Sequence, residues 1–364
     1  MTVITIDKNI CTGCRECANV CPVNAIEGVQ GQPQVINTDK CVMCGQCVQK
    51  CKSYVSLITH GTGAYENVRA ERGLPETVRE PLFAAHNVSH IQEVKAALAD
   101  PNVITMVQSA PAVRVAIAED FGAPLGTLAA GKLAAALRRI GFNFVYDTNF
   151  TADLTIMEEG TELISRVTKG GTLPMMTSCC PAWVTYLERN YPELKDHLSS
   201  CKSPQQMMGA VMKTYGAELN KVEPAKLFSV SVMPCTCKEF ECSREEMKDS
   251  GYQDVDVVLT TRELAWLIKD MGIDFNALPD EEFDNPLGDY SGAGTIFGVT
   301  GGVMEAALRT VYYVLTGKEH EAITFQQVRG FEGVREASLD INGMTVNVAI
   351  AHGMKNAKVL QWRR

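Results

Sequence analysis

The sequence lacks the excess of basic residues that binding to nucleic acid requires. Its 364 residues include 34 Lys and Arg against 43 Asp and Glu, a net charge of −9 at pH 7. Binding to a phosphate backbone needs a basic surface, so we expect no nucleic-acid partner. Disorder is excluded as well, because 46% of the residues are hydrophobic and supply a full core.

Long uninterrupted apolar runs are also missing. The Ala-rich stretch 110–137 is broken by Arg114, Glu119, Asp120 and Lys132, so we expect no membrane insertion. The first residues show no basic segment followed by an apolar one, which argues against a signal peptide. Together these observations predict a cytoplasmic location.

Cysteine is absent from residues 52–178 and from everything after Cys242. The 14 cysteines therefore form two groups, one within residues 11–51 and one within residues 179–242. Because disulfides are rare in cytosolic proteins, this clustering predicts metal binding instead of a disulfide framework.

The first group has a spacing typical of iron–sulfur proteins. Two runs have the form C-x2-C-x2-C-x3-C; the first is followed by Pro22 and the second by Lys52. In bacterial two-cluster ferredoxins the fourth cysteine of each run binds the other cluster. Zinc also binds four thiolates but does not need this doubled spacing. We predict two [4Fe-4S] clusters: cluster 1 on Cys11, Cys14, Cys17 and Cys51, and cluster 2 on Cys41, Cys44, Cys47 and Cys21.

Beyond residue 60 the pattern changes to alternating strands and helices. Glycine and proline within 61–85 indicate a linker, a helix with Ser89 as its N-cap follows, and both His86 and His90 are expected at the surface. The predicted strands are 103–107, 142–146, 172–177, 227–233 and 255–259, and the predicted helices are 124–140, 156–168, 204–219 and 261–272. The alternation favours an α/β architecture with parallel sheets. We expect an α+β ferredoxin domain at 1–60, a linker and helix at 61–100, and an α/β domain at 101–364.

The second group of cysteines lies in loops that follow two predicted strands. Cys179 and Cys180 come after the strand 172–177, and Cys235 and Cys237 come after the strand 227–233. The carboxyl ends of parallel strands carry the site in such folds, so the two loops are placed to share one metal centre. A Cys-Cys pair alone is more simply explained as two small buried side chains. Next to a second cysteine loop and an electron-transfer domain, it indicates a metal site.

Both loops resemble signatures of the [FeFe] hydrogenases. Residues 177–183, TSCCPAW, resemble the first signature, and residues 233–241, MPCTCKEFE, resemble the second. The likeness continues through 147–153, 157–159, 201–205, 291–298 and 301–309 and covers nearly the whole chain. It implies an α/β hydrogenase domain of two lobes, with parallel sheets flanked by helices.

The resemblance also implies a cofactor and a reaction. The cofactor is the H-cluster, a [4Fe-4S] cube joined through a cysteine sulfur to a diiron unit with carbon monoxide, cyanide and a dithiolate. The reaction is the reversible reduction of protons to H2 with electrons from the two N-terminal clusters. The implied partners are ferredoxin or other hydrogenase subunits, and the proteins that mature the H-cluster.

By motif position, the resemblance assigns roles to single residues. Cys180 and Cys235 would bind the cube, and Cys179 would pass protons to the amine of the dithiolate. Lys238 would pair with a cyanide, a natural partner for an ammonium in a dry pocket. Met233 and Pro111 are expected to line the cofactor. The proton relay positions are matched by Glu159, Glu162 and Ser199, although without the resemblance the two glutamates would be interpreted as a solvated helix face.

One signature of that family is not found. Its third motif supplies two more cube ligands in a C-x3-C arrangement, whereas no cysteine follows Cys242 here. Three explanations stay open: an incomplete C-terminus, a separate chain that supplies the motif, or a non-catalytic electron-transfer or redox- or H2-sensing protein on a hydrogenase scaffold. An iron–sulfur assembly protein of related ancestry is a weaker alternative.

Smaller departures concern the loops themselves. Ligation by Cys201, Cys237 or Cys242 in place of the missing pair would require a different loop fold. Ala182 stands where glycine is usual in the first signature, and Glu239 stands where a second lysine is common in the second.

Overall fold

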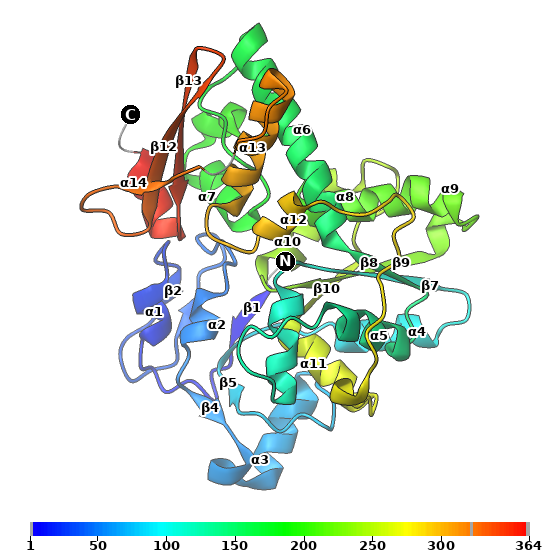
Figure 1. Ribbon diagram of the computed structural model, residues 1–364. Helices are drawn as coiled ribbons and strands as arrows, with labels where there is room; N and C mark the ends of the chain where they lie inside the picture. The colour runs from blue at the N-terminus through cyan, green and yellow to red at the C-terminus, as the bar shows by residue number, and fades with distance from the viewer. Residues whose placement is uncertain (1–2, 321–322, 362–364) are drawn as a thin grey trace. The chain divides into compact units, whose positions relative to one another are not determined.

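The computed structural model describes residues 3–320 and 323–361 (Figure 1). The chain divides into two compact units. Unit 1 consists of Met1–Thr148 and Gln205–Gly288, and unit 2 consists of Asn149–Pro204 and Asp289–Arg364. Among the described residues, none of the helices combines the length and the apolar character needed to cross a membrane.

The N-terminal part of unit 1 contains one small motif twice. Each copy has a short helix that carries the third cysteine of a run, α1 (Glu16–Val20) and α2 (Gln46–Lys50). Residues in the left-handed conformation, Arg15 and Gly45, precede the two helices. Three antiparallel strand pairs frame them: β1 (Ile4–Ile6) with β6 (Ala85–Asn87), β2 (Ile26–Glu27) with β3 (Val35–Ile36), and β4 (Tyr54–Val55) with β5 (Leu82–Phe83).

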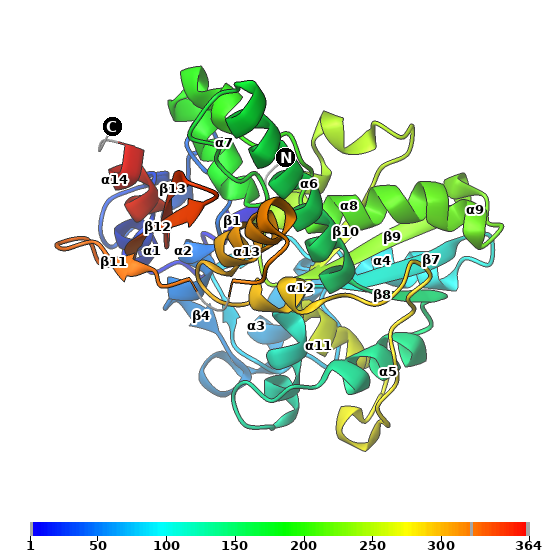
Figure 2. The ribbon, with the colours of Figure 1, turned by 45° about the horizontal axis from the view of Figure 1, so that its top comes forward.

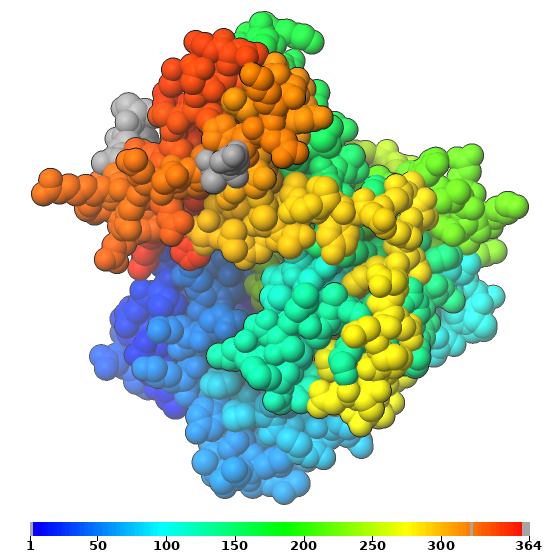
Figure 3. All heavy atoms as spheres, viewed as in Figure 1, coloured from blue at the N-terminus to red at the C-terminus, as the bar shows by residue number. Residues whose placement is uncertain are grey.

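The segment 61–85 is not a simple linker. Helix α3 (Leu57–Glu71) occupies its first part and bends at Gly61, whose φ of 77° lies outside the helical region. Tyr65 is fully buried with Val55, Leu74, Val78 and Leu82. In the space-filling view this segment (light blue) and the N-terminal residues (blue) form one continuous surface (Figure 3). Burial of Tyr65 thus outweighs the low helix propensity of the glycines.

Four parallel strands form the central sheet of unit 1, in the order β10-β9-β7-β8. They are β7 (Ile104–Ser109), β8 (Phe144–Asp147), β9 (Leu227–Met233) and β10 (Val257–Thr260). Nearly all of their residues are buried, as expected for a parallel sheet covered on both faces. The strands predicted at 103–107, 142–146, 227–233 and 255–259 are confirmed to within a few residues.

Helices cover this sheet on both sides, with α8 on one side and α5 and α11 on the other (Figure 2). The helices of this part are α4 (Ile91–Ala99), α5 (Ala130–Ile140), α8 (Pro204–Val211), a π-helical turn (Met212–Gly216), α9 (Ala217–Leu219), α10 (Cys237–Cys242) and α11 (Thr261–Asp270). Short 3-10 helices of unit 1 lie at Val113–Val115, Ile117–Phe121, Pro224–Lys226, Glu245–Lys248 and Phe275–Ala277, and one in unit 2 lies at Pro192–His197. The N-cap residue of α4 is His90, one position later than predicted.

Unit 2 contains helices and an antiparallel sheet. Its helices are α6 (Thr148–Lys169), α7 (Pro181–Asn190), α12 (Gly292–Ile296), α13 (Gly302–Thr316) and α14 (Met354–Gln361), and its strands are β11 (Gln326–Gln327), β12 (Val334–Ile341) and β13 (Met344–Ala351). Asn342 and Gly343, both with positive φ, form the two-residue turn between β12 and β13. The prediction of parallel sheets therefore holds for unit 1 alone.

The strand predicted at 172–177 is wrong. This segment forms a single bridge, Met176 with Leu198, and its first residues are exposed. Pro174 has no amide hydrogen to donate to a neighbouring strand, so the short apolar run does not extend into a ladder.

Gly209 provides a test of the packing of α8. A Cβ atom there would lie 2.2 Å from the carbonyl oxygen of Asp254, so we expect Gly209→Ala to lower the free energy of unfolding by about 1–3 kcal/mol. Gly63→Ala in α3 is the matched control, because its Cβ would meet no atom within 4 Å. Urea denaturation curves measure both variants, and equal midpoints would contradict the expectation.

Candidate functional site

The structure brings the cysteines assigned to cluster 1 together. Burial raises the pKa of the Cys17 thiol to about 11, and the nearby Cys11, Cys51 and Cys14 raise it further. Cys51, the last cysteine of the second run, thus lies with the first three cysteines of the first run. Cys14 is exposed, which places this group next to solvent.

The cysteines assigned to cluster 2 form a second group, deeper in unit 1. Burial raises the pKa of Cys47 to about 12, with Cys44 and Cys41 among the neighbours that add to it. Burial likewise raises the pKa of Cys44 to about 11, and its charged neighbours are Cys21, Cys41 and Cys235. Cys235 belongs to the second signature, so this group borders the loop after β9.

Backbone amides point at four of these sulfur atoms. Each of these sulfur atoms accepts a hydrogen bond from one backbone amide. The pairs are Cys11 with the amide of Gln34 (3.4 Å), Cys21 with that of Ala25 (3.2 Å), Cys41 with that of Met43 (3.4 Å) and Cys51 with that of Ala85 (3.4 Å). Amide donors stabilise the thiolate form that iron requires. The loop of the first run also needs Gly13, because a Cβ there would lie 2.4 Å from the backbone of Gln32. These residues fit iron–sulfur clusters.

The loop after β9 packs on the loop that carries Cys44. The Thr236 hydroxyl donates to the carbonyl of Met43 at 3.0 Å, and the Cys237 thiol donates to the carbonyl of Val42 at 3.4 Å. Gly45 is required at this contact, because a Cβ there would lie 2.8 Å from Oγ1 of Thr236. The second signature is therefore held directly against the predicted cluster 2.

Pro111 and Met233 lie at the same edge of the central sheet. The amide of Ala110, next to Pro111, donates to the carbonyl of Val232 at 3.1 Å. Met233 is buried and Pro111 is half-buried. The carboxyl edge of the sheet thus presents both residues beside the loop of Cys235.

A buried glutamine holds α10 and its lysine in place. Nε2 of Gln205 donates to the carbonyl of Lys238 (3.1 Å) and to Oε2 of Glu241 (3.2 Å), and its Oε1 accepts from the Ser231 hydroxyl (2.9 Å). Nζ of Lys238 also donates to Oε2 of Glu241 at 3.0 Å. The sequence assigned no role to Gln205 or Glu241; the only signal was that Gln205 lies in the resembling segment 201–205.

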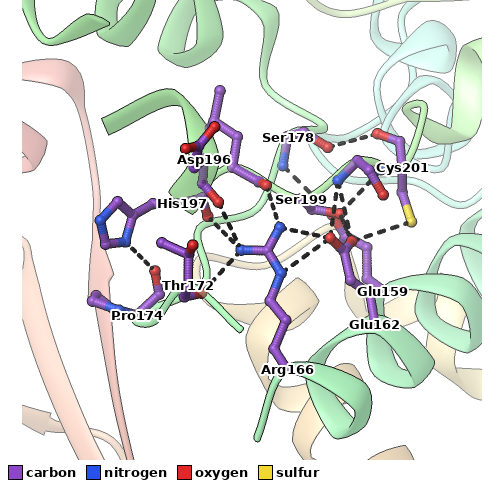
Figure 4. A network of polar contacts seen from close by, with 12 residues as sticks. Glu159, Glu162, Arg166, Thr172, Pro174, Ser178, Asp196, His197, Ser199 and Cys201 are labelled. Atoms are coloured by element: carbon purple, nitrogen blue, oxygen red, sulfur yellow. Dashed lines mark hydrogen bonds and ion pairs between the residues drawn. The ribbon is translucent and has the colours of Figure 1, made fainter. Parts of the chain in front are cut away.

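In unit 2, the first signature begins beside a buried carboxylate. The Ser178 amide donates to Oε1 of Glu159 at 3.5 Å, and the Ser178 hydroxyl donates to the carbonyl of Cys201 at 2.6 Å (Figure 4). Cys179, the next residue, is half-buried, and Cys180 is exposed in the N-cap position of α7. Pro181 occupies the first turn of that helix, where its missing amide hydrogen costs nothing.

Ser199 lies between the two glutamates of the predicted relay. Its hydroxyl donates to Oε2 of Glu162 at 2.7 Å, and Ser199 lies near enough to Glu159 to counteract in part the rise of its pKa. Burial raises the pKa of Glu159, whose side chain is 2% exposed, so a solvated helix face is excluded for it. Burial would also raise the pKa of Glu162, but hydrogen bonds from Ser199 and Arg166 outweigh it and lower that pKa.

Arg166 was not predicted, although it stands four residues after Glu162 on α6. Its Nη2 donates to Oε1 of Glu162 at 2.6 Å and to the carbonyl of Leu198 at 2.7 Å. Figure 4 shows this guanidinium between the carboxylate and the backbone of 196–198. The i, i+4 spacing was the signal that could have found it.

Comparison with known protein families shows which family this chain belongs to. Residues 103–362 match the family described as "Iron only hydrogenase large subunit, C-terminal domain", and residues 3–52 match the "4Fe-4S dicluster domain". This chain belongs to the iron-only hydrogenase large-subunit family.

Individual relatives agree with the family. The chain is 47% identical over 342 residues to the NADP-reducing hydrogenase subunit HndD of Solidesulfovibrio fructosivorans, covering 88% of this chain and 58% of that protein. It is 44% identical over 357 residues to the periplasmic [Fe] hydrogenase large subunit of Nitratidesulfovibrio vulgaris, covering 98% of this chain and 78% of that one. The chain thus spans little more than half of the first relative.

A solved hydrogenase structure is similar as well. The apo [FeFe]-hydrogenase HydA1 from Chlamydomonas reinhardtii, variant C377H, aligns with a TM-score of 0.68 and 43% sequence identity. The alignment covers 75% of this chain and 77% of that chain. The α/β hydrogenase fold predicted from the loops is therefore present.

Three cysteines have no assigned role in the site: Cys201, Cys237 and Cys242. Cys237 donates to the carbonyl of Val42, and Cys242 donates to the carbonyl of Glu239 at 3.0 Å. Burial raises the pKa of Cys242 to about 12 and that of Cys201 to about 11.

His90 is not a surface residue, contrary to the prediction. It is 9% exposed, and its Nε2 lies 2.6 Å from Oε1 of Glu239, the residue that departs from the hydrogenase pattern. This hydrogen bond raises the pKa of His90 to about 9. His86 is half-buried, and burial lowers its pKa to about 4. The sequence around both histidines is polar, so their burial depends on distant residues.

The His90–Glu239 pair makes stability depend on pH. The pKa of His90 is about 9 in the folded chain, against 6.5 for an unperturbed histidine. The pair therefore contributes fully to the free energy of unfolding below pH 6.5, and this contribution is lost as the pH rises through 9. We expect the difference in Tm between wild type and His90→Gln to be largest near pH 6 and to shrink by pH 9.5. Calorimetry over this range measures it, with the exposed His60→Gln as the control; a difference that grows with pH would refute the pairing.

Proposed function

We propose that this chain is the catalytic part of a ferredoxin-type [FeFe] hydrogenase, which reversibly reduces two protons to H2. The observation that carries the proposal is the contact between the Cys44 loop and the Cys235 loop, made by Thr236 and Cys237. It places the electron-transfer part and the second hydrogenase signature side by side within one unit. The H-cluster, when bound, supplies the iron atoms at which protons and electrons combine.

Electrons enter through the two N-terminal clusters in a fixed order. Cys11, Cys14, Cys17 and Cys51 would hold cluster 1, which would accept electrons at the surface because Cys14 is exposed. Cys21, Cys41, Cys44 and Cys47 would hold cluster 2 next to the second signature, because the Cys44 thiol lies close enough to Cys235 for their charges to interact. This order follows from the distance of each group to solvent and to the second signature.

The residues of the two signatures bind and orient the cofactor. Cys180 and Cys235 are the ligands that the family motifs assign to the cube. Lys238 would pair with a cyanide of the H-cluster, and Gln205 and Glu241 hold its helix. Met233 and Pro111 line the carboxyl edge of the sheet. The remaining two cube ligands are left unassigned.

Protons move through the buried chain of unit 2. Glu162, half-buried and held as a carboxylate by Arg166, takes them from the solvent side. Ser199 passes them to Glu159, whose pKa burial raises above that of an ordinary glutamate. Glu159 lies beside Ser178, the neighbour of Cys179, which completes the relay. Each step is a short hop between oxygen or sulfur atoms.

The partners follow from the same assignment. We propose ferredoxin or other hydrogenase subunits as electron partners, and maturation proteins as the source of the H-cluster. The relatives named above are a subunit of an NADP-reducing hydrogenase and the large subunit of a periplasmic hydrogenase. A cytoplasmic location remains our prediction for this chain.

The first test is an infrared spectrum of the chain, purified without oxygen after co-expression with maturation proteins. We expect bands of metal-bound carbon monoxide and cyanide together with hydrogen evolution from a reduced dye. A spectrum without these bands, from protein whose iron–sulfur absorption is intact, would overturn the proposal. It would favour a non-catalytic electron-transfer protein instead.

Substitution of one cysteine tests the second signature. Cys235→Ala should lose the infrared bands and bring hydrogen evolution to background, because a ligand of the cube is removed. Cys242→Ala is the matched control, since that thiol donates to the carbonyl of Glu239 and keeps its proton. Full activity in Cys235→Ala would contradict the assignment.

The relay is tested by a pair of neighbouring glutamates. Glu159→Gln keeps the shape of the buried side chain but cannot exchange a proton, so we expect turnover to fall by roughly 10²–10⁴-fold with unchanged infrared bands. Glu158→Gln, the same change at an exposed position, should leave turnover unchanged. Equal rates for the two variants would exclude Glu159 from the relay.

A further inference from the structure

Arg72, at the C-terminal end of α3, carries a buried charge that is only partly compensated. Its side chain is 9% exposed, and Nη2 lies 3.5 Å from Oδ2 of Asp7. Neither Nε nor Nη2 has a hydrogen-bond partner among the described residues. A buried guanidinium with two unpaired N–H groups is costly, so an acceptor is expected on that edge.

The surroundings of Arg72 identify that acceptor. The carbonyl of Asp7 accepts from the Cys11 amide at 2.9 Å, and its amide donates to Ala84 at 2.8 Å. The next residue on that strand, Ala85, donates its amide to the sulfur of Cys51 at 3.4 Å. Arg72 thus pairs with a residue whose neighbours contact both Cys11 and Cys51.

The charges around Arg72 agree with this position. Burial lowers the pKa of Arg72, whereas the negative charges of Asp7 and of the Cys51 thiolate raise it. Cys51 is therefore among its nearest anions. Burial and the charge of Arg72 together lower the pKa of His86 to about 4, so this histidine stays neutral at pH 7 and adds no second positive charge.

A cavity beside Arg72 offers no better acceptor. Its volume is about 930 Å³, and it is lined by residues of unit 1 that include Arg72, Glu263 and Trp266. Nε and Nη2 of Arg72 are buried from solvent, so they do not face the open volume of the cavity.

We infer that Arg72 raises the reduction potential of cluster 1. Reduction adds an electron to a cluster that four thiolates already make anionic, and a nearby positive charge stabilises the reduced form. N–H donors to sulfur act in the same direction. The inference rests on cluster binding by the N-terminal cysteines, and it is independent of hydrogen turnover.

Arg72 also makes the two clusters unequal. The amide contacts to sulfur are shared by both copies of the motif, with two sulfurs from each run. Arg72 comes from α3, outside the repeat, and lies beside Cys51. The repeat alone would give two similar clusters, and the added helix distinguishes the first from the second.

The test is an EPR-monitored redox titration of the chain, purified anaerobically without H-cluster maturation. Arg72→Met removes the charge with little change of volume, and we expect the midpoint potential of one cluster to shift to more negative values. Arg72→Lys keeps the charge and should titrate close to wild type. Arg79→Met, the same change at an exposed arginine of the same segment, should leave both midpoints unchanged. A Cys14→Ser variant, with an altered ligand, marks which signal belongs to cluster 1.

Three results would overturn the inference. They are unchanged midpoints in Arg72→Met with full iron content, an equal shift of both clusters, or a shift in Arg72→Lys as large as that in Arg72→Met. If Arg72→Met binds too little iron, Arg72→Gln removes the charge in its place and is judged by the same criteria. Absence of hydrogen evolution or of infrared bands leaves this titration unaffected, so its failure is distinguishable from failure of the proposed function.

Discussion

The contact between the Cys44 loop and the Cys235 loop is the interaction on which the proposed electron route depends. Two side chains make it, Thr236 and Cys237, and their carbonyl partners lie 193 and 195 residues earlier in the chain. Both hydrogen bonds are accepted by backbone carbonyl oxygens, so they fix the backbone position of the Cys44 loop and not only a side chain. Electron transfer between metal centres needs such a fixed approach.

The same edge of the central sheet collects the other residues of the second signature. The strands β7 and β9 are parallel neighbours, so the loops after them lie together and bring Pro111 to Met233. Gln205 then ties α10 to β9 through Ser231 and to its own lysine through the carbonyl of Lys238. A buried amide with each of these partners satisfied specifies one position of the helix.

Electrostatics separates the roles of the two relay glutamates. Glu159 is buried, and burial raises its pKa. Glu162 accepts hydrogen bonds from Ser199 and Arg166, and these lower its pKa. Burial thus favours a proton on Glu159, whereas the hydrogen bonds to Glu162 favour its carboxylate form. Arg72 applies the same physics to electrons, because a buried positive charge favours the reduced form of its neighbour.

The sequence by itself determined the parts whose cause is local. Ligand spacing is set within a few residues, so the cysteine runs predicted the iron–sulfur domain, and the apolar runs predicted four strands of the parallel sheet. The tertiary structure decided the rest. Helix α3 forms in part of the predicted linker because Tyr65 is buried there. Residues 172–177 form a single bridge instead of a strand, and His90 pairs with Glu239. Arg166 and Arg72 also acquire their roles only there, because burial and the pairing of charges depend on neighbours that are distant along the chain.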